Sequence, residues 1–233
     1  MARVKAPTLV MPAPLPREML LDERLQFPDP RAATDKGLVA IGGDFSVARL
    51  LLAYRSGIFP WTDQPISWWS PDPRGVFELD QFHISRSFAR SLRKHPYTIT
   101  TDHAFRQVME ACAAPDTRRG PTWISAAFIE AYTRLHAQGH AHSVECWRGA
   151  DLVGGIYGVA VGGLFAGESM FHRADNASKI ALHQLITHLR SRGFGLFDIQ
   201  MVTDITRQLG ATEISREEYL KRLSQAVSLR CSF

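Results

Sequence analysis

The sequence contains no apolar run that approaches the ~20 residues needed to cross a bilayer, and its short apolar patch 8–11 ends at Pro12. We therefore expect neither a membrane anchor nor a secretory signal. The three cysteines are widely spaced and form no CxxC pair, which argues against a zinc or redox motif and fits free thiols in the cytoplasm. No fixed-period repeat is visible, so solenoid and propeller folds are excluded.

Acidic residues are missing from the stretch between Asp80 and Asp102, although the net charge of the chain is only +4. If a helix starts near Ser85, the basic residues of this stretch share one of its faces. They are Arg86, Arg90, Arg93 and Lys94. Such a stripe could bind the phosphate backbone of a nucleic acid. A helix face that is simply exposed to solvent explains it equally well.

Composition is that of a packed globular protein, with 45% hydrophobic and 21% charged residues in a chain of 233. Helical and strand-like patterns alternate from Arg74 onward, which predicts a mixed α/β (α+β) fold. We place a domain boundary there. Residues 1–73 would form a small N-terminal domain with a proline-rich arm and an aromatic loop, and residues 74–233 would form the larger domain.

Local patterns predict most of the elements. Ser46 caps a helix that ends at Gly57, and segment 59–73, rich in proline and tryptophan, is expected to be a rigid shaped loop. Further helices are expected from Ser85, after Asp102, after Ser125, over 177–192 and after Ser215. Strands are expected at 76–79, 97–100, 143–147, 152–161, 164–171 and 196–201, the fourth and its two neighbours along the chain forming a β-meander.

The last of these strands carries a polar pair. Side chains two apart on a strand share a face, so Asp198 and Gln200 point the same way. Burying an unpaired carboxylate there would be costly. An exposed sheet face or a structural ion pair explains the pattern as well as a catalytic site does.

A second carboxylate, Glu168, lies among apolar and small residues and therefore needs a partner. A guanidinium of a substrate would serve, through a charge-assisted contact. The three histidines His136, His140 and His142 have a spacing that suggests a metal site, but Gly139 interrupts their helix, so we predict no metal.

Tryptophans at 61, 68, 69 and 123 could stack on bases or line an apolar pocket, and core packing explains each of them alone.

Matching sequence blocks run from about Phe27 almost to the C-terminal helix. They read GLVAIGGDFS, LLAYRSGIFPW, WWSPDPRGV, HISRS, TWIS, EAYTRLHAQGHAHSVE, LVGGIYGVAVGGLFAGESMF, NASKIAL and FDIQ. Together these blocks resemble the leucyl/phenylalanyl-tRNA-protein transferase family.

The resemblance implies a GNAT-like acyltransferase domain with a mixed sheet, which works without metal, without coenzyme A and without any other cofactor. It implies the transfer of leucine or phenylalanine, and weakly of methionine, from aminoacyl-tRNA to proteins that begin with arginine or lysine. Such proteins would be marked for degradation by the N-end rule. The expected partners are therefore leucyl-tRNA, phenylalanyl-tRNA and these acceptor proteins, and the enzyme is expected to be a cytoplasmic monomer.

By the same resemblance, Asp198 and Gln200 are the catalytic pair, and Glu168 orients the acceptor. The basic helix residues Arg86, Arg90, Arg93 and Lys94 would bind tRNA. The residues expected to bind the aminoacyl end are Trp61, Trp123, Phe165, Tyr54, Tyr132, Met170 and Leu185. The chain departs from many relatives at Ile205 and Leu185, which affects only the fine substrate preference.

The aminoacyl ester is already activated, so no covalent enzyme nucleophile is required. We expect Asp198 to take the proton of the attacking amine, directly or through Gln200. Alternatively, Asp198 and Glu168 both bind the acceptor's basic side chain, and water or the tRNA removes the proton. Two other functions compete: a coenzyme A-dependent N-acyltransferase, although its pyrophosphate loop is not evident, and a non-catalytic RNA-binding protein.

Overall fold

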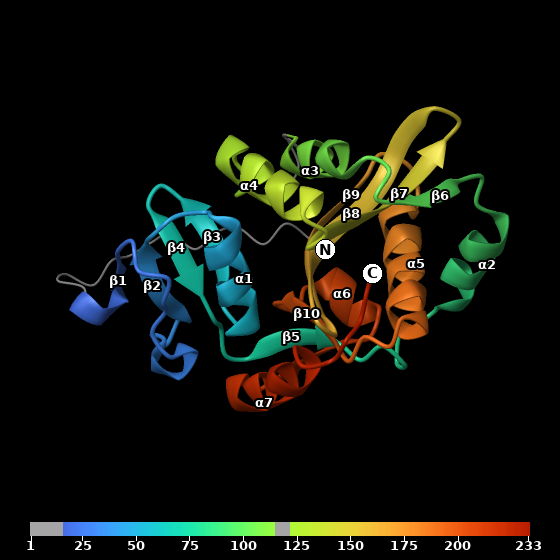
Figure 1. Ribbon diagram of the computed structural model, residues 1–233. Coiled ribbons are helices and arrows are strands. Elements are labelled where there is room, and N and C mark those ends of the chain that lie inside the picture. The colour runs from blue at the N-terminus through green and yellow to red at the C-terminus, as the bar shows by residue number, and fades with distance from the viewer. Residues whose placement is uncertain (1–15, 115–121) are drawn as a thin grey trace.

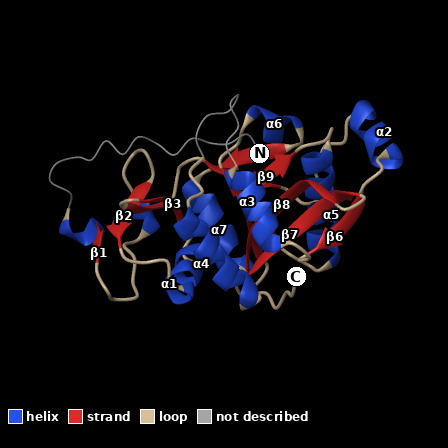
Figure 2. Cartoon of the chain, turned by 90° about the horizontal axis from the view of Figure 1, so that it is seen from above, coloured by secondary structure: helices blue, strands red, loops and turns tan. Residues whose placement is uncertain are grey.

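The computed structural model describes residues 16–114 and 122–233 (Figure 1). These residues form a four-stranded sheet near the N-terminus and a seven-stranded sheet that takes up most of the rest. The view from above places the two sheets at opposite ends of the molecule, with helices between and around them (Figure 2). Pro12 and Pro14, in the expected proline-rich arm, lie outside the described residues.

The N-terminal sheet has the strand order β1-β2-β4-β3. Its elements, with two 3-10 helices, are η1 (Arg17–Met19), β1 (Leu20–Leu21), η2 (Pro30–Ala32), β2 (Leu38–Gly42), β3 (Phe59–Asp63) and β4 (Ile66–Trp69). The prediction of a loop over 59–73 was therefore wrong for the part that forms β3 and β4. The loop was predicted because the proline and aromatic residues of this segment fit neither helix nor strand periodicity. However, β3 is an edge strand, where the missing N–H of Pro60 need cost no ladder hydrogen bond.

Helix α1 (Val47–Arg55) follows this sheet's second strand and confirms the sequence prediction. The Ser46 hydroxyl accepts a hydrogen bond from the backbone N–H of Arg49, which satisfies one of the free donors at the helix start. The helix ends before Gly57, whose φ of 78° lies in the left-handed region that favours glycine.

The large sheet has the order β11-β5-β10-β9-β8-β7-β6. Its strands are β5 (Arg74–Phe77), β6 (Thr98–Thr101), β7 (Ala141–Arg148), β8 (Asp151–Val161), β9 (Leu164–His172), β10 (Leu196–Gln200) and β11 (Ala211–Ile214). Strands β6 to β9 are antiparallel, whereas β10 runs parallel to β9 and antiparallel to β5. The predicted mixed sheet and its meander are thus confirmed.

Helices cover both faces of this sheet. They are α2 (Arg86–Lys94), α3 (Phe105–Ala113), α4 (Ala126–Ala137), α5 (Ala177–Ser191), α6 (Asp204–Gln208) and α7 (Arg216–Ala226). Successive residues of β9 point to two separate core clusters: Leu164 and Ala166 belong to the first and Phe165 to the second. Helices α3 and α4 contribute to the first cluster, and α5 to the second (Figure 1).

The first core cluster also contains residues of the N-terminal sheet, such as Trp68 and Val39, so the two sheets share one apolar core. The division of the chain into domains near Arg74 stays a prediction. In the described ranges, no helix is both long and apolar enough to span a bilayer.

Two irregularities in the large sheet shape the site. Tyr157 on β8 pairs with Ser169 and Gly158 pairs with Gly167, so Glu168 is an extra residue, a β-bulge on β9. On β10, the register with β5 shifts between Asp198 and Gln200. Bulges redirect side chains, and both of these occur at residues that the sequence had indicated.

Candidate active site

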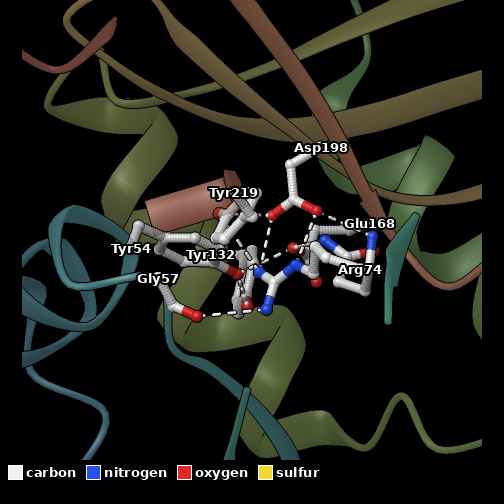
Figure 3. A network of polar contacts seen from close by, with 8 residues as sticks. Tyr54, Gly57, Arg74, Tyr132, Glu168, Asp198 and Tyr219 are labelled. Atoms are coloured by element: carbon white, nitrogen blue, oxygen red, sulfur yellow. Dashed lines mark hydrogen bonds and ion pairs between the residues drawn. The ribbon is translucent and has the colours of Figure 1, made fainter. Parts of the chain in front are cut away.

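A buried group of polar side chains lies where α1, α4 and α7 meet the face of the large sheet that packs on the first core cluster (Figure 3). Each element gives one or two of its members, and none of them is more than 8% exposed. The group, called the polar network below, consists of Tyr54, Arg74, Tyr132, Glu168, Asp198, Gln200 and Tyr219. Sequence positions 54 to 219 thus converge on one place.

Asp198 and Arg74 form the central ion pair of the polar network. Arg74 Nε donates to Asp198 Oδ1 at 2.9 Å, and Nη2 donates to Oδ2 at 2.7 Å. Both side chains are 1% exposed. Burial opposes the charge of Arg74, but the Asp198 carboxylate, together with Tyr219 and Glu168, raises the pKa of the guanidinium overall. The pair therefore holds two opposite charges away from water.

Glu168 lies beside this pair and has neutral partners. Tyr54 donates to Glu168 Oε1 at 2.8 Å, and Gln200 Nε2 donates to the same oxygen at 3.3 Å. The hydroxyls of Tyr54 and Tyr132 are also hydrogen-bonded to each other. The carboxylate, the amide and the two phenols thus form one connected chain of hydrogen bonds.

Burial dominates the titration of Glu168. It raises the pKa of the carboxyl to about 8; the hydrogen bond from Tyr54 acts in the opposite direction, and the nearby Asp198 charge adds to the rise. Burial, followed by the charge on Glu168, likewise raises the pKa values of Tyr54 and Tyr132 well above 10. At neutral pH Glu168 therefore holds its proton most of the time, and a cation brought close to it would favour the ionised form.

The predicted tryptophans lie in or against the first core cluster. Trp61 is 7% exposed and packs edge-on against Trp69, with ring centroids 5.4 Å apart. Trp123 is half-buried and contacts the Phe128 ring edge-on at 5.1 Å. Phe128 in turn lies 6.1 Å from the Tyr132 ring of the polar network.

Three residues expected at the aminoacyl end lie elsewhere. All three are at most 5% exposed and belong to the second core cluster: Phe165 and Met170 lie on β9 and Leu185 on α5. The structure therefore does not bring them to the face of the sheet that holds Glu168. Alternation along β9 separates Phe165 from that face, because Phe165 and Ala166 point to opposite faces. Met170 lies beyond the bulge at Glu168, which interrupts the alternation, and Leu185 lies on α5.

The basic stripe lies on α2, as its spacing predicted. Arg86, Arg90, Arg93 and Lys94 are all exposed, and none has an acidic partner within ion-pair distance among the described residues. Ser85 caps the helix, and Asn176 at the start of α5 donates to Ser91 at 3.1 Å. Helix α2 lies at the edge of the molecule, across α5 from the polar network (Figure 1).

The histidines suspected of metal binding have other partners. His142 Nδ1 lies 2.7 Å from Asp102 Oδ2, and His136 Nδ1 lies 2.8 Å from the carbonyl oxygen of Ala141. Across residues 16–114 and 122–233, no group of three or more acidic, histidine or cysteine side chains is arranged to hold a metal ion.

Sequence reasoning missed two members of the polar network. Arg74 stood only at the expected domain boundary, although it is the first residue of the strand β5, whose residues are all buried. Tyr219 lies on the apolar face of α7 and carried no signal that separates a hydrogen-bonding tyrosine from a packing one.

Comparison with known sequences gives one consistent result. Residues 76–224 match the family described as "Leucyl/phenylalanyl-tRNA protein transferase", and residues 43–72 match "Leucyl/phenylalanyl-tRNA protein transferase N-terminal domain". A Leucyl/phenylalanyl-tRNA--protein transferase of Cellvibrio japonicus (strain Ueda107) is 53% identical over 203 residues, 85% of this chain and 86% of the relative. The protein of the same name from Escherichia coli O139:H28 (strain E24377A / ETEC) is 52% identical over 205 residues, 86% of this chain and 87% of the relative.

Solved structures with similar folds are much more distant. One is "The structure of L-PGS from Bacillus licheniformis", with a TM-score of 0.42 and 12% identity, covering 79% of this chain and 71% of that one. Another is a GCN5-related N-acetyltransferase-like protein from Streptococcus suis 89/1591, with a TM-score of 0.35 and 13% identity, covering 61% and 57%. Scores this low carry no argument about function.

Proposed function

The chain belongs to the leucyl/phenylalanyl-tRNA-protein transferase family, and from this premise we propose that it moves leucine or phenylalanine from aminoacyl-tRNA to the N-terminus of a protein. The acceptors are proteins that begin with arginine or lysine. The observation that carries the proposal is Glu168, a buried carboxyl hydrogen-bonded to an amide and a phenol within the matched region.

The reaction needs little from the protein beyond alignment. The amine nitrogen attacks the ester carbonyl carbon, a C–N bond forms, and the C–O bond to the terminal ribose of the tRNA breaks. One proton leaves the amine, and the ribose oxygen gains one. An α-amine has a pKa near 7.7 to 8.0, so an appreciable fraction is neutral at about pH 7. Holding the amine against the ester therefore removes much of the barrier.

Glu168 suits the recognition of a basic acceptor. With its pKa at about 8, it is neutral when the site is empty at pH 7, and the guanidinium of an N-terminal arginine would drive it to ionise. Its proton would be released as the acceptor binds. An acceptor with an acidic first residue would bring no cation to drive this ionisation and would gain no ion pair with Glu168, which supports the preference for arginine and lysine.

The roles of the remaining residues are proposals of the same kind. Trp61 and Trp123, in the aromatic part of the first core cluster, would hold the leucyl or phenylalanyl side chain, with Tyr54 and Tyr132 next to it. The position of β9 would be set from the opposite face of the sheet by three residues of the second core cluster, Phe165, Met170 and Leu185. Helix α2 would bind the phosphate backbone of the tRNA through its exposed basic face.

Broader context follows from the substrates. Aminoacyl-tRNA is made in the cytoplasm, so we place the protein there, acting as a monomer and without metal, coenzyme A or another cofactor. Its products would be marked for degradation by the N-end rule. We keep residues 1–73 and 74–233 as its two domains, the second of them GNAT-like.

Radiolabelled leucyl-tRNA and a peptide that begins with arginine test the proposal directly. We expect the label to appear on the peptide's α-amine, and an otherwise identical peptide with N-terminal glutamate to remain unlabelled. A parallel reaction with labelled acetyl-coenzyme A tests the rival N-acyltransferase. Binding of leucyl-tRNA without any transfer would overturn the proposal in favour of an RNA-binding protein, and acetylation would favour the rival enzyme.

A further inference from the structure

The carboxylate of Asp198 has no free acceptor position. Four donors reach it: Arg74 Nε and the backbone N–H of Gln200 on Oδ1, and Arg74 Nη2 and the Tyr219 hydroxyl on Oδ2. The hydrogen bonds from the Gln200 N–H and the Tyr219 hydroxyl are 2.8 and 2.9 Å long. A carboxylate has about four lone-pair positions, so an incoming amine would have to displace one of these donors.

Arg74 is itself held on every side. Its third nitrogen, Nη1, donates to the carbonyl oxygen of Gly57 at 3.0 Å. The guanidinium carbon lies 4.3 Å from the centroid of the Tyr219 ring and 4.9 Å from that of Phe59. A planar cation fixed between two rings and three oxygens has little freedom, so it fixes Asp198 in turn.

Gln200 has a strained backbone conformation. Its φ of 59° lies in the left-handed region, which is unfavourable for a residue with a side chain and persists only where the surroundings enforce it. Its N–H bond to Asp198 is one such constraint. The partner strand supplies another: a Cβ on Gly75 would lie 2.7 Å from the carbonyl carbon of Met201, so only glycine allows the chain to pass there.

We propose that Arg74, Asp198 and Tyr219 form a clamp that sets the Gln200 backbone so that its side-chain amide faces Glu168 and the acceptor amine. The inference rests on the proposed function and deepens it. Asp198 is then a positioning residue, Arg74 is a second one, and the proton that leaves the amine ends on the ribose oxygen of the tRNA without passing through Asp198. Gln200 is the member of the pair that meets the substrate.

Amide hydrogen exchange at Gln200 tests the clamp without any need for activity. Tyr219→Phe keeps the ring but removes one donor to Asp198, and we expect exchange at Gln200 to become about tenfold faster relative to other β10 amides. The control is Arg49→Gln, since Arg49 is equally buried but pairs with Asp44, outside the polar network. Unchanged exchange in Tyr219→Phe overturns the clamp.

Single-turnover transfer separates a clamp from a base. We expect Arg74→Lys and Asp198→Asn each to slow transfer by about 10- to 100-fold, with the double variant no slower than the worse single one and the pH profile unchanged in shape. An Asp198 base predicts instead that Asp198→Asn alone changes the shape of the pH profile and abolishes transfer, whereas Arg74→Lys only slows it. That result would refute the positioning role, whereas a wild-type chain that transfers no leucine would refute only the proposed function.

Discussion

Tyr54 donates a 2.8 Å hydrogen bond to Glu168 although 114 residues separate them in the chain. The bond joins α1, next to the small sheet, to the bulge on β9 of the large sheet. The pKa of the Glu168 carboxyl therefore depends on how the two sheets pack against each other.

Removal of this hydroxyl should weaken the recognition of basic acceptors. Tyr54→Phe deletes a donor that favours the ionised form of Glu168, so we expect kcat/KM for an arginine-initiated peptide to fall by about 10- to 100-fold at pH 7. Steady-state kinetics with varied peptide and saturating leucyl-tRNA measure this change in kcat/KM.

The matched control is Tyr157→Phe. Tyr157 is fully buried on β8, and its hydroxyl has no hydrogen-bond partner in the described part of the chain. We expect this variant to keep wild-type kinetics. An equal loss in both variants would mean that Tyr54 acts through packing and not through its hydroxyl.

Glu168 should make the protein less stable as the pH rises. Its carboxyl ionises near pH 4.5 when unfolded and at about 8 when folded, so between these values the folded state binds more protons than the unfolded state. The free energy of unfolding should fall through this window by at most about 1.4 kcal/mol per pH unit. Urea unfolding at a series of pH values should show this decline in the wild type and a flatter curve in Glu168→Gln. Parallel curves would mean that Glu168 does not titrate there.

The basic face of α2 should set the salt dependence of the transfer. We expect Arg90→Gln with Arg93→Gln to raise the KM for leucyl-tRNA about tenfold at moderate salt, and to lower the slope of log KM against log salt by about one for each arginine. Arg55→Gln, at an exposed arginine on α1, is the control for net charge. If all three arginines contribute equally, the attraction is a property of the total charge and not of α2.

Two glycines with the same backbone conformation should differ in their tolerance of alanine. Gly57 and Gly139 have φ values of 78° and 75°, but a Cβ at Gly57 would lie 2.7 Å from Leu220 and 3.0 Å from the Tyr219 ring, whereas nothing lies within 4 Å at Gly139. We expect Gly139→Ala to cost about 1 kcal/mol and Gly57→Ala about 2 to 3. Thermal unfolding measures both, and transfer should slow only in Gly57→Ala, which displaces the Arg74 and Tyr219 contacts.

Methionyl-tRNA should be a weak donor. An apolar pocket distinguishes side chains by shape, and a difference of one methylene is worth only about 1 to 3 kcal/mol. We therefore expect methionine transfer at a reduced but measurable rate in competition with leucine. Rejection of methionyl-tRNA as complete as that of aspartyl-tRNA would contradict an apolar, shape-selective pocket.

The sequence predicted the elements of the large sheet well, because their periodicity is strong and glycines separate them. The alternation on β10 correctly placed Asp198 and Gln200 on one side, where they share the polar network. The sequence-based prediction failed at β3 and β4, where proline and tryptophan obscured the strand pattern. The short elements α6 and β11 were missed because four or five residues give too little pattern to detect.

The contacts of the candidate site were harder to predict than its members. Glu168 was expected to wait for a cation from the substrate, yet tyrosines from α1 and α4 surround it. Asp198 was expected to be available to an amine, yet Arg74 from 124 residues earlier in the chain occupies it. Such pairings depend on how distant segments pack, and local sequence spacing does not encode that.

Tyr219 lies on α7, the last helix of the chain, whereas Tyr54 comes from the first α-helix. During synthesis on the ribosome, the polar network around Glu168 and Asp198 is therefore incomplete until almost the whole polypeptide has emerged. A chain that stops before α7 would carry Asp198 without the Tyr219 hydroxyl that donates to its carboxylate.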